Sequence, residues 1–344
     1  MTTQALLPVT ILTGFLGAGK TTLINYLLTQ DKTEKILIIE NEFGPTNIDS
    51  QLFPSAQNIE VLEMTNGCIC CSVQGELTTA LHQLNQRRLA GTLHFDRLII
   101  ETTGLADPAP ILQTFFIDTL IRETFEIDGI ITLVDSEHIL KQLDEHRVAH
   151  SQIGFADRLI LTKTDRISTA QKETVLHRLA TINRKATLFV AVKGEIPKAA
   201  WLDIHAFELT DELEMNKGFF VIDAQRPQST HYQPLIQQPT SQHLSYNDDI
   251  RSYLFEAGEL DIKTIGAFVE TLIEQYGNDM LRYKGVLAIK DNPAKLIVQG
   301  VHKVVGFDYA ALWQADEVPQ SRFVVISRKL PFERLYQQFL DTEA

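Results

Sequence analysis

Short apolar runs alternate with longer stretches of helical periodicity along residues 1–200 of the chain. Continuously apolar runs are typical of strands that are buried on both faces of a parallel sheet. Regular alternation of strands and helices predicts an α/β fold, a mostly parallel, doubly wound sheet with helices on both faces. The expected strands are Val9–Thr13, Lys35–Ile39, Ile59–Leu62, Arg97–Ile100, Gly129–Val134, Arg158–Thr162 and Thr187–Val192. The expected helices between them include Thr21–Thr29, Glu76–Arg88 and Ala170–Ile182.

The pattern changes near residue 224. The stretch Ala224–His243 holds three prolines and many Gln, Ser and Thr residues, which favours a linker. Beyond it we expect strands at Ile250–Glu256, Gly285–Ile289, Lys295–Val301 and Arg322–Ile326, and helices at Ile262–Tyr276 and Pro331–Phe339. We therefore predict a first domain over residues 1–223, a linker over 224–243 and a smaller α+β domain over 244–344.

Composition and charge narrow the classes of function. Hydrophobic residues make up 44% and charged residues 22% of the chain, as in ordinary globular proteins. The formal net charge of −13, with no long run of Lys or Arg, disfavours nucleic acid as a partner. No apolar stretch approaches the length of a membrane span, and the first residues lack the basic start of a secretory signal. We expect a cytoplasmic protein with no membrane partner.

A phosphate-binding loop is the strongest motif. Residues 14–21 read GFLGAGKT, which fits G-x4-G-K-[ST] between an apolar run and a predicted helix. Backbone amides of such a loop surround phosphates, Lys20 reaches the β- and γ-phosphates, and the Thr21 hydroxyl binds Mg²⁺. The alternative, a glycine-rich turn without a ligand, does not require the full pattern. The predicted phosphate-binding residues are Gly14, Gly17, Ala18, Gly19, Lys20, Thr21 and Thr22.

The predicted strand Arg97–Ile100 continues into Glu101 and reaches Gly104 three residues later. In phosphate-loop proteins an acid at such a strand end holds Mg²⁺ or its water shell, and the glycine amide senses the γ-phosphate. We therefore expect Glu101 to hold Mg²⁺ and Gly104 to contact nucleotide. A carboxylate that is merely solvated at a strand end is the alternative.

A base-reading element follows a later strand. Thr162, Lys163 and Asp165 resemble the N-K-x-D element that selects guanine. The Asp165 carboxylate would accept two hydrogen bonds, from guanine N1–H and N2–H₂, which adenine does not offer. Thr162 stands where Asn is most common. The alternative is an ordinary helix N-terminus.

The only three cysteines of the chain are Cys68, Cys70 and Cys71. Such crowding is unlike a secreted disulfide framework and favours a reducing compartment. Thiolates at C-x-C-C spacing converge on one soft or borderline metal ion and leave a fourth position open. Inert buried thiols and a redox switch are the alternatives. Glu40 and Glu42, after an earlier strand, either complete the metal shell, face the γ-phosphate or are solvated.

Histidine is less informative than cysteine. His146 and His150 have i,i+4 spacing on an expected helix, for which a solvated helix face is favoured over a metal site. His302 lies in an apolar run and is expected to be a packed strand residue.

Together these motifs resemble the CobW-like P-loop GTPases, relatives of the nickel-insertion GTPases HypB and UreG, and among them the YjiA type. The resemblance extends past the first domain, to the segments 281–285 and 298–302. Two departures stand out, Thr162 in place of Asn and the absence of the histidine-rich tract that many relatives carry.

The resemblance implies a GTPase with GTP and Mg²⁺ that carries a transition metal, usually Zn²⁺, with Co²⁺ and Ni²⁺ left open. Cys68, Cys70 and Cys71 would hold this metal, which GTP hydrolysis delivers to a client metalloprotein. Glu42 would lie in a switch loop between nucleotide and metal, and Glu101 to Asp107 would form the second switch. The sequence shows no general base, so Lys20, Thr21, Glu42, Glu101 and Asp107 are the candidate catalytic residues, an acid only positioning water.

Several readings remain open from the sequence. A redox-sensing GTPase without a physiological metal, a GTPase that delivers cobalt or nickel to a cofactor-assembly enzyme, a metal-dependent enzyme and an ATP-dependent kinase are the alternatives. The oligomeric state is also open, and a homo-oligomer is compatible with the sequence.

Overall fold

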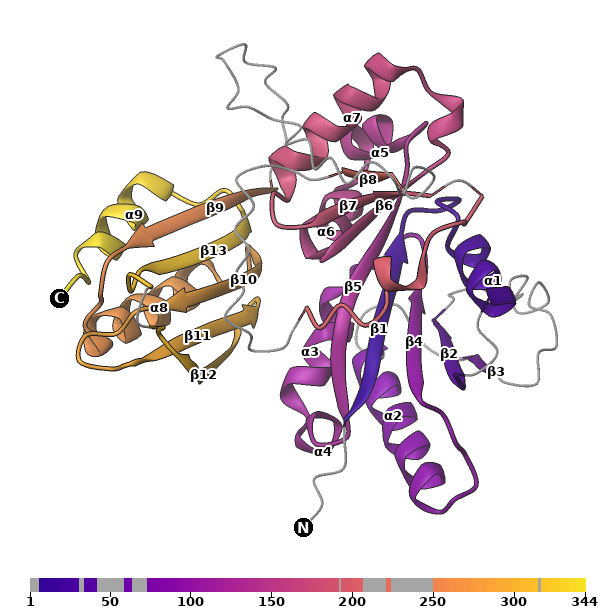
Figure 1. Ribbon diagram of the computed structural model, residues 1–344, viewed down its shortest axis with the longest axis horizontal. Helices are drawn as coiled ribbons and strands as arrows, with labels where there is room; N and C mark the ends of the chain where they lie inside the picture. The colour runs from indigo at the N-terminus through magenta and orange to yellow at the C-terminus, as the bar shows by residue number, and fades with distance from the viewer. Residues whose placement is uncertain are drawn as a thin grey trace.

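Two β-sheets organise the chain, a parallel one from its first part and an antiparallel one from its last part (Figure 1). The computed structural model describes residues 6–30, 34–41, 59–63, 73–191, 193–206, 221–223, 250–314 and 317–344. The expected α/β fold with a smaller α+β domain is confirmed. The predicted linker Ala224–His243 lies outside the described residues.

The parallel sheet has the strand order β3-β2-β4-β1-β5-β6-β7-β8, and every neighbouring pair is parallel. Its strands are β1 (Leu7–Gly14), β2 (Ile36–Asn41), β3 (Ile59–Glu63), β4 (Arg97–Thr102), β5 (Phe125–Asp135), β6 (Arg158–Thr162), β7 (Thr187–Val190) and β8 (Val221–Asp223). All seven predicted strands are present, with bounds shifted by a few residues. The continuous apolar runs arise because β1, β4 and β5 are buried along nearly their whole length.

Helices cover both faces of this sheet (Figure 1). They are α1 (Lys20–Gln30), α2 (Val73–Leu89), α3 (Ala109–Ile117), α4 (Thr119–Arg122), α5 (Ile139–Glu145), α6 (Arg147–Phe155) and α7 (Thr169–Ile182), with short 3-10 turns at Thr164–Arg166 and Lys198–Ala200. One core joins α2, α3, α6 and α7 to one face, and a second core joins α1 and the segment around Trp201 to the other. A doubly wound sheet places its ligand site at the carboxyl ends of the strands.

The antiparallel sheet has the order β12-β11-β10-β13-β9. Its strands are β9 (Ile250–Ala257), β10 (Met280–Leu287), β11 (Ala294–Val301), β12 (Val304–Leu312) and β13 (Ser321–Arg328), and its helices are α8 (Ile262–Tyr276) and α9 (Phe332–Leu340). The helices share one core with one face of the sheet. The sequence did not predict β12, whose residues are mostly exposed and so carry no burial pattern.

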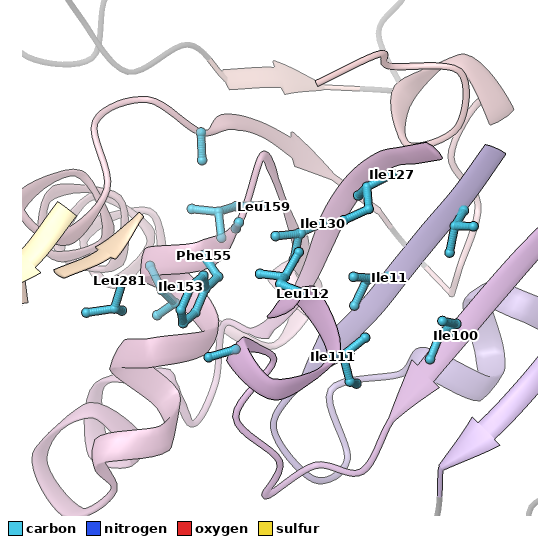
Figure 2. Close-up of a cluster of buried hydrophobic side chains, with 14 of the residues drawn as sticks. Ile11, Ile100, Ile111, Leu112, Ile127, Ile130, Ile153, Phe155, Leu159 and Leu281 are labelled. Carbon is cyan, nitrogen blue, oxygen red and sulfur yellow. The ribbon is translucent and has the colours of Figure 1, made fainter. Parts of the chain in front are cut away.

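The two sheets meet through α6, which lies against the antiparallel sheet (Figure 1). Figure 2 shows Ile153 and Phe155 of α6 between Leu159 of the parallel sheet and Leu281 of β10. Four residues of the antiparallel sheet belong to the same hydrophobic core as the parallel sheet: Ile250, Leu281, Val301 and Ile326. The core is therefore continuous between the two sheets.

Two expectations about histidine were wrong. His146 is in extended conformation between α5 and α6, and His150 within α6 is buried, so the two do not form a solvated helix face. Helix α6 packs against both sheets, and His150 is buried with it. His302 lies in the turn between β11 and β12 with φ of 50°, not in a strand, and its ring packs edge-on against Phe155.

In the part of the chain that the structure describes, no helix combines the length and apolar character needed to cross a membrane.

Candidate functional site

The predicted phosphate loop connects β1 to α1. Gly14, at the end of β1, has φ of 138°, and a Cβ atom there would lie 2.5 Å from the Leu133 carbonyl oxygen of β5. Gly19 has φ of 100°, a conformation that side chains disfavour. Both glycines are thus required by the backbone path, which follows the path that a phosphate-binding loop takes.

Lys20 begins α1 and is 9% exposed. Its Nζ donates a hydrogen bond of 2.9 Å to the carbonyl oxygen of Gly14, so the ammonium group lies across the loop. Thr21 and Thr22 follow in the first turn, half-buried and exposed respectively. The helix N-terminus and the ammonium group together give the loop a positive potential, which suits a polyphosphate.

Thr162, the last residue of β6, is buried beside this loop. Its hydroxyl lies 2.8 Å from the carbonyl oxygen of Ala18 and 3.3 Å from that of Val134. A hydroxyl has one hydrogen to donate, so the shorter contact, to Ala18, is the hydrogen bond. Thr162 therefore fixes the base-reading segment to the phosphate loop, a task that a short hydroxyl side chain fulfils without Asn.

Lys163 has φ of 55°, and its Nζ lies 2.7 Å from Oδ2 of Asp135, the last residue of β5. His138 Nδ1 lies 3.0 Å from the same oxygen, and the backbone amide of Glu137 donates to Oδ1. Burial favours a higher pKa for Asp135, but the hydrogen bonds from Lys163 and His138 outweigh it and hold this pKa below its usual value. Asp135 is therefore an anion that orients Lys163, a role that the sequence did not predict.

Asp165 is exposed in the 3-10 turn Thr164–Arg166, beyond the end of β6. Its carboxylate is accessible to a ligand bound at the carboxyl ends of the parallel strands, where the phosphate loop also lies. Gly194, in the loop after β7, lies on the same edge, since a Cβ atom there would be 2.9 Å from the Thr22 carbonyl oxygen. The sequence analysis did not predict a role for this loop, although Gly194, two residues after the predicted strand Thr187–Val192, was a signal for it.

Two buried acids end neighbouring strands. Glu40 of β2 pairs in register with Glu101 of β4, and these residues are 4% and 8% exposed. Glu101 is also in register with Leu12 of β1, near the start of the phosphate loop. Buried carboxylates are found with cations or hydrogen-bond donors, and carboxylate oxygens are ligands that Mg²⁺ accepts. The sequence predicted a Mg²⁺ site at Glu101. It did not predict that the strand register would place Glu40 beside Glu101.

Gly104 touches the phosphate loop. A Cβ atom at Gly104 would lie 2.5 Å from the backbone nitrogen of Leu16, so only glycine allows this approach. The Gln152 amide donates to the carbonyl oxygens of Gly104 and Ala106, at 3.2 and 3.1 Å. Gln152 is a residue of the site region that the sequence did not single out, because a lone Gln within a helical pattern carries no motif.

Asp107 has a local structural role. Its Oδ1 accepts a hydrogen bond of 3.0 Å from the backbone amide of Ala109, the first residue of α3. The side chain thus binds an otherwise unpaired amide at a helix start. The proposal that Asp107 also acts in hydrolysis stays a prediction.

Part of the predicted site lies outside the described residues: Cys68, Cys70, Cys71 and Glu42. Within the described ranges, one group has metal-type ligand atoms within 4.8 Å of one another, formed by Asp135, Glu137 and His138. Lys163 donates to this same Asp135 carboxylate. An ammonium group at 2.7 Å disfavours a metal ion there, so we assign the group to the orientation of Lys163.

The described residues thus form a cradle for a polyphosphate, two buried acids beside it and an accessible carboxylate at the next strand end. This combination fits a nucleoside triphosphate with a divalent cation and a base that offers two donors.

Two family models match the chain. The model described as CobW/HypB/UreG, nucleotide-binding domain matches residues 8–190, and that described as cobalamin synthesis protein cobW C-terminal domain matches residues 250–343. The matches coincide with the parallel and the antiparallel sheet.

Several characterised proteins resemble the whole chain. It is 38% identical to zinc chaperone YjiA of Escherichia coli, over 96% of this chain and 97% of that one. It is 33% identical to zinc chaperone CobW of Pseudomonas aeruginosa, over 96% and 90% of the two chains. The crystal structure of Zn(II)-bound YjiA GTPase from E. coli superposes with a TM-score of 0.77 at 33% identity, covering 99% of this chain and 100% of that one.

Proposed function

The chain belongs to the CobW/HypB/UreG family of P-loop GTPases, and on this premise we propose that it is a GTPase that carries zinc and delivers it to a client metalloprotein. Its relatives YjiA and CobW are named zinc chaperones. The observation that carries the nucleotide part of the proposal is the convergence of the loop 14–21, Gly104 and Asp165 at one edge of the parallel sheet.

Guanine specificity rests on Asp165. Its exposed carboxylate follows Thr162, which is bound to the loop carbonyl of Ala18, so base and phosphates would be held at a fixed separation. Lys163, oriented by Asp135, would lie along the base. An adenine base would leave the Asp165 charge without its two donors, which is costly in a site closed by ligand.

The residues of the phosphate end fit a magnesium ion. Thr21 in the first turn of α1 and Glu101 at the end of β4 would hold it, directly or through water, and Glu40 adds a second buried carboxyl in register. Mg²⁺ supplies neutralisation of charge on the β- and γ-phosphate oxygens. Lys20 binds the same phosphates, and the Gly104 amide contacts the γ-phosphate.

Zinc is the cargo in this proposal. Three thiolates, from Cys68, Cys70 and Cys71, are a ligand set that zinc prefers, and Glu40 or Glu42 would supply a further ligand. A set with one open position suits transfer better than a closed structural site. The crowded cysteines also support a cytoplasmic setting, where thiols stay reduced.

A zinc competition titration tests the proposal. Anaerobically purified protein is titrated against a zinc chelator with Mg²⁺ and GDP, then with Mg²⁺ and a non-hydrolysable GTP analogue. We expect stoichiometric zinc, bound more tightly with the analogue because metal and nucleotide affinities are reciprocally coupled. Equal affinity in both states would contradict nucleotide-controlled delivery.

Two variants serve as matched controls for this titration. The triple variant C68A/C70A/C71A should lose tight zinc but bind GDP as the wild type does. K20A should lose nucleotide and retain zinc in the absence of nucleotide. Cobalt and nickel are titrated in the same way, and a preference for either over zinc would contradict zinc as the cargo.

A further inference from the structure

Helix α6 connects the loop that contacts nucleotide to the antiparallel sheet. We propose that Gln152 is a positioning residue through which the nucleotide state of the Gly104–Ala106 segment is transmitted, by way of α6, to the antiparallel sheet. The inference rests on the proposed GTPase function. It assigns to Gln152 a positioning role and no contact with the nucleotide itself.

The first contact joins Gln152, in the C-terminal half of α6, to the segment that follows β4. The Gln152 side-chain amide donates both of its hydrogens, to the carbonyl oxygens of Gly104 and Ala106. Gln152 is 1% exposed, so water does not replace these bonds when the segment moves. A displacement of Gly104 must therefore either break two buried hydrogen bonds or move Gln152 with it.

The same segment is tightly coupled to the phosphate loop. Gly104 approaches the backbone of Leu16 so closely that a Cβ atom would overlap it. Phe15 of that loop also stacks on His146, which precedes α6, with ring centroids 4.9 Å apart. The phosphate loop therefore contacts both the Gly104–Ala106 segment, which Gln152 binds, and His146, the residue before α6.

The second set of contacts joins the same C-terminal half of α6 to the antiparallel sheet. Arg282 of β10 donates to the Phe155 carbonyl oxygen at 3.3 Å and forms an ion pair with Asp157. Arg328 of β13 donates to the Ser151 hydroxyl at 3.3 Å. A Cβ atom at Gly154 would lie 2.8 Å from Leu281, which shows how closely α6 and β10 pack. Figure 2 shows Leu281 against Ile153 and Phe155.

Hydrogen bonds also hold the C-terminal end of α6. The helix has nine residues, and the buried Asn183 amide donates to the carbonyl oxygens of Ile153 and Ala156 at its end. Close-packed elements transmit displacement instead of absorbing it, so a shift at Gln152 reaches β10 and β13.

Hydrogen–deuterium exchange of the full chain tests the proposal. The readout is the difference in amide protection between Mg²⁺–GDP and a Mg²⁺–GTP analogue, in peptides that cover α6 (147–155) and β10 (280–287). We expect a difference of about fivefold or more in exchange rate in both peptides of the wild type, the scale of a typical coupling between sites. In Q152M, a variant of similar length without hydrogen-bond donors, this difference should disappear while GDP still binds.

A second variant separates positioning from simple loss of packing. T132V removes a buried hydrogen bond to the backbone of the same residue and leaves the side-chain amide of Gln152 in place. It should retain the wild-type difference. A nucleotide-dependent difference that survives in Q152M, or that is lost equally in T132V, would overturn the role of Gln152.

The outcomes also distinguish this inference from the proposed function. Wild-type protein that hydrolyses GTP but shows no difference in the 280–287 peptide would overturn transmission alone. Wild-type protein that binds no guanine nucleotide would overturn both.

Discussion

The hydroxyl of Thr162 donates a 2.8 Å hydrogen bond to the carbonyl oxygen of Ala18, joining residues 144 positions apart in the chain. The donor ends the strand that carries the base-reading element, and the acceptor lies inside the phosphate loop. The position where Asn is most common is thus filled by a side chain that holds two ligand-binding segments together. Sequence comparison alone would count this threonine as a departure from the motif.

Thr162→Val tests this connection. Valine keeps the shape but leaves the Ala18 carbonyl oxygen without its donor, which costs about 1 kcal/mol of unfolding free energy. Because the phosphate loop is then less well fixed, we expect GDP and GTP alike to bind about fivefold more weakly. Thr162→Ser retains the hydroxyl and should bind within about twofold of the wild type. Isothermal titration calorimetry measures both. Equal affinities for the valine and serine variants would contradict a role for the hydrogen bond.

Asp135→Asn should weaken both stability and guanine binding. The native carboxylate has a lowered pKa, so its stabilising effect is present above its usual value of 3.8 and is lost as pH falls through the lower folded value. At neutral pH we expect a loss of about 1–3 kcal/mol in unfolding free energy. Urea unfolding from neutral to acid pH should show the two curves converging below pH 3.8. The control is Asp308→Asn at an exposed position of β12, which should change the unfolding free energy at neutral pH by less than about 0.5 kcal/mol.

Arg282→Met should strongly destabilise the joint between the two sheets. The side chains of Arg282 and Asp157 are 5% and 6% exposed, so removal of one leaves a buried charge, at a cost of about 3–5 kcal/mol. Urea unfolding of Arg282→Met, of Asp157→Asn and of R282M/D157N completes a double-mutant cycle. The double variant should lose less unfolding free energy than the two single variants lose together. Arg322→Met breaks a more exposed pair with Glu256 in the same sheet and should cost less than about 1 kcal/mol.

Lys185→Met should stabilise the protein. Lys185 is partly buried, and desolvation together with repulsion from Arg282 and Lys284 holds its pKa well below 10.5, although Asp157 partly offsets this. In the unfolded chain the group binds its proton more strongly, so stability rises with pH between the lowered value and 10.5. In urea unfolding, we expect the variant to gain about 1 kcal/mol of unfolding free energy near neutral pH. This gain should shrink toward pH 10.5. The exposed Lys290→Met is the control, and a loss of stability in K185M would contradict the assignment.

The fold was largely predictable because buried parallel strands leave a strong pattern. Val9–Thr13 and Arg158–Thr162 are rich in buried apolar residues because both faces of their strands are covered by helices. The strand at Val304–Leu312 escaped prediction because its residues are mostly exposed. The burial of His150 could not be predicted from local spacing, because helix α6 packs against both sheets and those contacts are distant in the chain.

The site was predictable where a motif fixes the backbone and unpredictable where contacts join distant segments. Gly14 and Gly19 are recognisable because their conformations tolerate only glycine in practice. The roles of Asp135 and Gln152 depend on partners that are 28 and 48 residues away. Register explains the pairing of Glu40 with Glu101, which no linear spacing reveals.

The continuous core between the sheets has a consequence for how such chains diverge. Ile250, Leu281 and Ile326 pack into the core of the nucleotide-binding half, and Gly154 is as small as that packing demands. If the C-terminal half were replaced by that of a distant relative, it would pack against a surface shaped for a different C-terminal half. The two halves should therefore be inherited as a unit, with substitutions in α6 and β10 that compensate one another across the joint.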